Sequence, residues 1–298
     1  MNTQHLPRKP ALPATGRALS GKLPALLAAS SVLALASAQA QLIKYEDFES
    51  YTDGQVLANN GTTSVDGWTK GTNASNRTFN ATVLEESGGN KYLLQDKGGA
   101  AGGPAVVLQP GSGFGATTAD DGFQTLFFRF QVSTTAPNDS NPNNKAGFGI
   151  GAATDSGNPF NPKAGFDIDG NGQIFNSNSS TTVGTALDPN VWYNAWFAVD
   201  HRGTQAGSTA ELWVQSDSDA NYATQTLVGS TFYNNIGASA YDIIYFNSEN
   251  ISGPAFAVDD IFYDNTGKNL VNPIPEPSSA VLISGLVAGA MLLRRRRR

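Results

Sequence analysis

Cysteine is absent from all 298 residues of the chain. Its absence excludes disulfides, thiolate catalysis and cysteine-based zinc sites. Only two histidines are present, and His5 lies in the N-terminal leader described below, which leaves His201 for the rest of the chain. A metal centre built from several histidines is therefore excluded, and a Ser-His-Asp triad would depend wholly on His201.

Helical periodicity is missing as well. No stretch keeps apolar residues at a 3.6-residue spacing over three turns, whereas many segments alternate between apolar and polar residues, as strands do. The clearest is Val191–Val199, which places on one face Tyr193, Ala195, Phe197 and Val199, and on the other Trp192, Asn194 and Trp196. We expect further strands at Thr82–Leu84, Tyr92–Gln95, Ala105–Leu108, Leu126–Val132, Gly147–Ala152, Gly165–Ile168, Gln173–Asn176, Glu211–Gln215, Ala240–Phe246 and Ala255–Tyr263.

Turn-forming clusters separate these strands at spacings typical of a sandwich. Asp169-Gly170-Asn171-Gly172 is a strong hairpin signal. Together with Asp167 it also matches the start of an EF-hand-type loop, but position 12 is Asn178 rather than Glu, and no helix follows. A tight β-turn is therefore favoured over a calcium loop, and the sequence predicts an all-β, antiparallel β-sandwich.

The C-terminus has the composition of a sorting tail. Residues 273–298 comprise a Pro-rich spacer, the uncharged run Ala280–Leu293 and five consecutive arginines. As a helix, the 14-residue run would span about 21 Å, which makes a short transmembrane helix. The arginines predict a cytoplasmic C-terminus by the positive-inside rule, with the preceding domain outside.

This tail resembles the PEP-CTERM sorting signal of Gram-negative bacteria, through the motif Pro275-Glu276-Pro277, the apolar helix and the basic end in that order. The resemblance implies cleavage near the motif by an exosortase and export in bacteria that make extracellular polysaccharide. The protein would then be anchored transiently in the inner membrane on its way to the outer envelope or the extracellular surface. The alternative is an ordinary single-span C-terminal anchor.

The N-terminus predicts a signal peptide over residues 1–40. A basic stretch precedes the apolar run Leu23–Ala36, and Ala38-Gln39-Ala40 fits a signal peptidase site that would leave Gln41 first. The body then covers residues 41–272, enough for one sizeable core. It holds ten of the 19 basic and 24 of the 25 acidic residues, a net charge near −14. Such a surface repels nucleic acid and anionic membranes.

The body resembles the concanavalin A-like, or laminin G-like, jelly rolls of bacterial surface proteins. Three places carry the resemblance: the opening Tyr45–Gly54 with Gly67-Trp68; Trp192-Tyr193 and Val199-Asp200 followed by Leu212-Trp213-Val214; and the closing Val258-Asp259-Asp260-Ile261. The same opening and closing occur in jelly-roll carbohydrate-binding modules, so both sandwich types remain open.

Acidic residues gather near both ends of the body. Terminal strands often lie side by side in jelly rolls, and carboxylates are ligands that Ca²⁺ prefers. One hypothesis is a structural calcium site with Glu46, Glu49 and Asp260 as ligands, in line with the terminal calcium site of the related carbohydrate-binding modules. The alternative is that these charges protect edge strands from aggregation.

Trp192, Trp196 and Trp213 are candidates for stacking on sugar rings, because an indole has a flat apolar face and a polar edge. The alternative for each is core packing. Trp192 and Trp196 share a face, which predicts that both are buried or both exposed. No glutamate of the body shows the Glu-x-Asp-x-x-Glu spacing of the laminarinase-type enzymes of this fold, and His201-Arg202 is the only hint of a lyase.

The sequence thus predicts an exported, non-catalytic β-sandwich that binds glycan or has a structural role in an extracellular polysaccharide matrix. The alternative is a polysaccharide-cleaving enzyme, a glycoside hydrolase or lyase, of the same fold. A third reading is an adhesion or surface-assembly module that uses calcium.

Overall fold

The computed structural model describes residues 42–59, 63–70, 80–95, 105–108, 123–133, 145–151, 164–177, 179–200, 209–232, 243–248 and 255–274, all within the unit formed by residues 40–298. The predicted signal peptide, the motif Pro275-Glu276-Pro277, the apolar segment behind it and His201 lie outside the described residues. Within the described part of the chain, no helix is long and apolar enough to cross a membrane.

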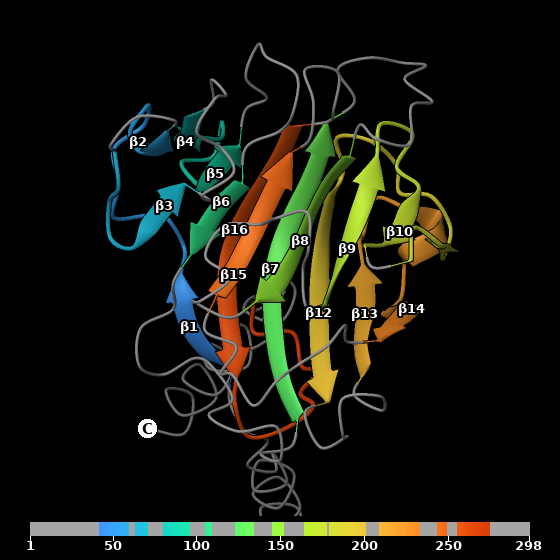
Figure 1. Cartoon of the computed structure of the whole chain (residues 1–298). Helices are drawn as coiled ribbons and strands as arrows, with labels where there is room; N and C mark the ends of the chain where they lie inside the picture. Colours follow the sequence, from blue (N-terminus) through green and yellow to red (C-terminus); the bar gives the residue numbers. More distant parts are fainter. Residues whose placement is uncertain are drawn as a thin grey trace, which may run out of the picture. The chain divides into compact units, whose positions relative to one another are not determined.

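Sixteen strands and one 3₁₀ turn make up the described structure (Figure 1). The strands are β1 (Ile43–Glu46), β2 (Val56–Asn59), β3 (Trp68–Lys70), β4 (Asn80–Glu85), β5 (Lys91–Gln95), β6 (Ala105–Leu108), β7 (Phe123–Ser133), β8 (Lys145–Gly151), β9 (Ala164–Asp169), β10 (Ile174–Asn176), β11 (Thr182–Val183), β12 (Trp192–Asp200), β13 (Thr209–Gln215), β14 (Thr226–Phe232), β15 (Ile243–Ser248) and β16 (Ala255–Asp264), and the turn is η3 (Ala220–Tyr222).

The strands form two sheets. The nine-stranded sheet runs β14-β13-β12-β7-β16-β5-β4-β2, with β1 added beside β16, and the seven-stranded sheet runs β11-β10-β9-β8-β15-β6-β3. All the strand pairs are antiparallel. Figure 1 shows β15, β8 and β9 lying across β16, β7 and β12. The described fold is therefore the antiparallel β-sandwich that the sequence predicts.

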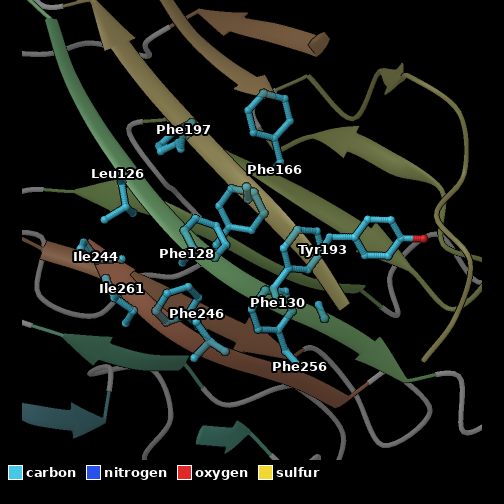
Figure 2. Close-up of a cluster of buried hydrophobic side chains, with 14 of the residues drawn as sticks. Leu126, Phe128, Phe130, Phe166, Tyr193, Phe197, Ile244, Phe246, Phe256 and Ile261 are labelled. Atoms are coloured by element: carbon cyan, nitrogen blue, oxygen red, sulfur yellow. The ribbon is translucent and has the colours of Figure 1, made fainter. Parts of the chain in front are cut away.

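The core lies between the two sheets and contains a cluster of packed aromatic rings (Figure 2). The Phe128 ring of β7 packs edge-on against Phe148 of β8, with the ring centroids 4.7 Å apart, and against Phe246 of β15 at 5.5 Å. Tyr193 and Phe197 of β12 belong to the same cluster. Burying such side chains, at about 1.5–3 kcal/mol each, gives a disulfide-free domain its stability.

Eleven of the strands were predicted at or near their observed bounds. The four-residue β6 matches its prediction at both ends, and β12 is one residue out of step with Val191–Val199. The hairpin at residues 169–172 is also confirmed. The Asp169 carboxylate accepts hydrogen bonds from the backbone N–H groups of Asn171 and Gln173, both at 2.9 Å, and Gly172 has a φ of 79°, which a glycine adopts without strain.

The two ends of the domain meet in the nine-stranded sheet, since β1 pairs with β16 in antiparallel register. The expectation that the terminal strands lie side by side is thus confirmed. β16 bulges at this point: its register against β7 shifts between Asp259 and Phe262, and Asp260 has a φ of 49°. A non-glycine residue in that conformation costs free energy, so surrounding contacts must hold it.

Candidate functional site

A row of four aromatic residues crosses the outer face of the nine-stranded sheet. The strand register places Trp196 of β12 between Trp213 of β13 and Phe127 of β7, and Phe127 beside Phe262 of β16. The Phe127 ring packs edge-on against Trp196 and Phe262, with the centroids 5.2 Å and 5.9 Å away. This row faces away from the inter-sheet core, so the other sheet does not shield its rings from solvent.

The cover is the C-terminal strap, which we define as residues 269–274, together with Leu42. The Trp196 indole Nε1 donates a hydrogen bond to the Val271 carbonyl at 2.9 Å, and Gln225 donates to the Leu270 carbonyl at 2.8 Å. Trp196 is completely buried as a result. It therefore cannot stack on a sugar, and the prediction that Trp196 and Trp192 share the same exposure is wrong.

Trp213 lies at the end of the row and is half-buried. The Lys268 ammonium group sits 5.0 Å from the centre of its ring and forms an ion pair with Glu211. The Trp213 indole Nε1 donates to the same Glu211 carboxylate at 2.9 Å. A cation therefore lies over the Trp213 ring and its indole N–H is bonded, which is also true of Trp192.

Trp192, at the start of β12, has a different setting and is also half-buried. Its indole Nε1 donates to the Glu86 carboxylate at 2.6 Å. The Tyr92 ring meets it nearly edge-on, with the centroids 5.5 Å apart, and the Arg129 guanidinium lies 4.9 Å from the ring centre. An amphipathic ring is thus held rigidly among polar groups.

Arg129 is held in turn by the bulge of β16. Its Nη1 contacts the carboxylates of Asp259 at 3.3 Å and Asp260 at 3.4 Å, and the Asn90 amide donates to Asp259 at 2.9 Å. Burial, with a smaller contribution from the neighbouring Asp260, raises the pKa of Asp259 to about 7. Asp259 is completely buried, so it acts on the site by positioning Arg129.

Several polar atoms remain for a ligand around this ring. Within the described residues, the contacts of Arg129 use only Nη1, which leaves Nε and Nη2. Glu86 uses only Oε1 and Asn90 only its amide nitrogen in side-chain hydrogen bonds among these residues. An aromatic ring whose contact network carries two unused donors and two unused acceptors is suited to a neutral molecule that carries several hydroxyl groups.

The three predicted calcium ligands do not come together. Glu46 accepts hydrogen bonds from the backbone N–H of Phe48 at 2.8 Å and from the Tyr51 hydroxyl at 3.2 Å. Glu49 accepts from the backbone N–H of Lys91 at 2.9 Å, and Asp260 faces Arg129. No three His, Asp or Glu side chains in the described part of the chain form a group that could hold a metal ion.

Near the pairing of β1 with β16, the carboxylates are instead neutralised by cationic side chains of the protein. Arg129 lies against Asp259 and Asp260, and Lys44 forms an ion pair with Asp47. The residues present therefore do not fit a calcium site at Glu46, Glu49 and Asp260.

Sequence reasoning found Trp192 but missed its partners. The partners come from other segments of the chain: Arg129 lies 63 positions before Trp192 and Glu86 lies 106 positions before it, with Tyr92 between them. In the sequence, Glu86 looks solvated because it precedes a Gly-Gly turn. One signal was available: Arg129 is the one charged residue in the largely apolar run Leu126–Val132, in the alternating register that points it outward.

No family model matches the sequence, and no curated protein matches it. Solved structures with a similar fold include lectin II from Ulex europaeus, with a TM-score of 0.45 and 10% identity over 74% of this chain and 97% of that one. Winged bean acidic lectin follows at 0.44 and 9% over 75% and 98%, and peanut lectin at 0.43 and 12% over 75% and 97%. TM-scores below 0.5 assign neither a family nor a ligand.

Proposed function

We propose that this protein is a non-catalytic carbohydrate-binding protein whose site surrounds Trp192 on the outer face of the nine-stranded sheet. The observation that carries the proposal is the half-buried Trp192 indole, fixed by Tyr92 and Arg129, with unused hydrogen-bonding atoms on Arg129, Glu86 and Asn90 in the same contact network.

A pyranose ring matches this arrangement in both of its parts. Its axial C–H groups form an apolar patch that packs on an indole face, while its hydroxyl groups donate and accept hydrogen bonds around the edge. Glu86 and Arg129 carry opposite charges, so the site as a whole favours an uncharged sugar over an anion. The acidic body, near −14, points the same way.

Export and sorting are part of the same proposal. The leader over residues 1–40 would be removed by signal peptidase, and the tail from Pro275 onward would be recognised by an exosortase after transient insertion in the inner membrane. In the sequence, the motif Pro275-Glu276-Pro277 directly follows the strap. The protein would act at the outer envelope or in extracellular polysaccharide.

The test is retention on a panel of immobilised neutral and acidic polysaccharides, with Trp192→Ala and Trp213→Ala as the matched pair. Both variants remove a half-buried indole from the same sheet face. We expect the wild type and Trp213→Ala to be retained on at least one neutral polysaccharide and Trp192→Ala to lose about tenfold or more in affinity. Equal binding by all three proteins, or none by the wild type, would refute the site.

A separate measurement tests the proposal that the protein is not an enzyme. A polysaccharide retained in this panel should release no new reducing or unsaturated ends during prolonged incubation with the protein, and their release would establish the enzyme alternative.

A further inference from the structure

The outer face of the seven-stranded sheet carries a strip of glycines. Gly147 and Gly149 alternate along β8 with the buried core residues Ala146, Phe148 and Ile150, so they point away from the core. Gly165 lies beside Gly149 on β9. The Tyr245 hydroxyl lies over Gly149 and Gly165, where side chains at those positions would collide with it. The strip is thus a floor on which neighbouring side chains lie close to the backbone.

Two polar side chains converge over Gly147. Asp167 of β9 and Asn247 of β15 are its register partners on the two sides. A β-carbon placed on Gly147 would be 2.7 Å from Asp167 Oδ1 and 2.9 Å from Asn247 Oδ1. A carboxylate and a carboxamide therefore approach each other from two strands, with no side chain between them.

Asn247 is not satisfied by the protein. Asn247 is 1% exposed, and neither its Oδ1 nor its Nδ2 has a hydrogen-bond partner. An unpaired buried amide costs stability, and such groups in native proteins call for a ligand, a trapped water or a strained state as their explanation. Here the amide points at a second polar group over a glycine floor, which is the arrangement of a binding site.

Lys145 lies beside Asp167 and adds a positive charge to these two polar side chains. The Lys145 ammonium lies 4.0 Å from Asp167 Oδ2 and 4.6 Å from the centre of the Phe175 ring. The side chains of Lys145 and Asp167 are 9% and 14% exposed, so they lie nearer the surface than Asn247, which is the inner end of the group. Their charges cancel, which favours an uncharged ligand with both donors and acceptors.

We propose that Asp167, Lys145 and Asn247 form a second carbohydrate-binding site, on the face of the sandwich opposite to Trp192. Adjacent hydroxyl groups of a sugar would donate to Asp167, accept from Lys145 and exchange hydrogen bonds with the Asn247 amide, which has one donor and one acceptor side. With a site on each outer face, the domain would bridge two polysaccharide chains. This inference rests on the proposed function, because it takes the same class of ligand.

The test is titration calorimetry of the full chain with cellohexaose, laminarihexaose and maltohexaose, using Asn247→Leu, Trp192→Ala and the double variant. Leucine keeps the branching and the number of heavy atoms of the asparagine side chain and removes both hydrogen-bonding groups. We expect two sites in the wild type, one in each single variant and none in the double variant. As a second variant, Asp167→Asn should weaken the remaining site of Trp192→Ala about tenfold.

The possible outcomes separate the two proposals. A single site that only Trp192→Ala removes overturns the second site and keeps the proposed function. A single site that only Asn247→Leu removes overturns the Trp192 site and the bridging role. Unchanged binding in Asn247→Leu, whatever its melting temperature, would show that the amide does not contact a sugar, and it overturns the inference. Binding of none of the three sugars by the wild type overturns it for neutral glucans.

Asn176→Leu is the matched control for folding. Asn176 is a buried asparagine of the same sheet, but its Oδ1 accepts a hydrogen bond from Thr231 at 2.7 Å. Asn176→Leu should lower the melting temperature while Asn247→Leu raises it. A fall of similar size in both variants would mean that Asn247 is satisfied in solution, and that result contradicts the inference.

Discussion

The indole nitrogen of Trp196 and the carbonyl of Val271 are joined by a 2.9 Å hydrogen bond across 75 positions of the chain. This contact makes the C-terminal strap part of the fold rather than a linker. Without the strap, Trp196, Phe127 and Phe262 would form an exposed aromatic row on the outer face of the sheet. Large exposed apolar patches on a soluble domain promote association, so the strap also protects the protein from aggregation.

Two truncations test the role of the strap. A chain that ends at Ile274 keeps it, and one that ends at Lys268 loses all of it. The shorter chain should lose about 3 kcal/mol or more of unfolding free energy, because two fully buried aromatic side chains become exposed. Denaturant titration measures the difference, and binding of a hydrophobic dye should rise only in the shorter chain. Equal stability of the two would show that the strap does not hold the row.

Stability should rise as the pH falls from 8 toward 5. Burial raises the pKa of Asp259 to about 7 and that of Asp167 to about 6, above the ordinary value of 3.8. The folded state therefore binds more protons than the unfolded state between about pH 4 and 7, and unfolding free energy must fall as pH increases through this range. Melting temperatures measured at several pH values and constant ionic strength test this dependence.

Asp259→Asn isolates the contribution of Asp259, since it keeps the shape and removes the titration. We expect a flatter dependence of the melting temperature on pH between 6 and 8 in this variant, with the part due to Asp167 remaining. A wild-type melting temperature that rises from pH 5 to pH 8 has the opposite sign and would contradict the burial of these carboxyl groups.

Chelation should leave the described domain unaffected. Glu46, Glu49 and Asp260 already bind backbone N–H groups or Arg129, so none of them depends on an added cation. EDTA should change the melting temperature by less than about 1 °C, because a cation that is not bound contributes no stability. A clear drop that is restored by calcium, but not by magnesium, would revive the calcium hypothesis.

The Tyr193 hydroxyl ties β12 to the turn η3. It donates to the Asp219 carboxylate at 2.6 Å and accepts from the Asp188 backbone N–H at 2.7 Å. Tyr193→Phe should cost about 1–2 kcal/mol of unfolding free energy, since it removes a buried hydrogen bond and leaves the aromatic packing in place. Denaturant titration provides the value, and an unchanged stability would mean that the hydroxyl is not bonded in solution.

The core-facing half of the fold was readable from the sequence. Alternation in Val191–Val199 placed Tyr193 and Phe197 on one face, and both lie in the core between the sheets. Such strands can be predicted from the sequence because one face meets only apolar neighbours and the other mostly polar ones. β14 was not predicted: its segment TLVGSTF carries a Gly and a register shift against β13, which weaken the alternating pattern.

The outer faces were harder to predict, because their environment depends on distant segments. Trp192 and Trp196 are equivalent by register, yet the strap covers only Trp196. Asn247 and Asp167 are 80 positions apart in sequence and meet only because β15 and β9 both pair with β8. No local pattern encodes such a pairing, since it depends on the order of strands in the sheet.

The central claim is that a sugar binds at Trp192, and the indole N–H resonances test it most directly. The chain has four tryptophans, Trp68, Trp192, Trp196 and Trp213, so protein labelled with ¹⁵N-tryptophan gives four indole signals. Titration with a retained oligosaccharide should shift the Trp192 signal most and leave those of the fully buried Trp68 and Trp196 in place. Saturable binding with no shift of the Trp192 signal would contradict the account.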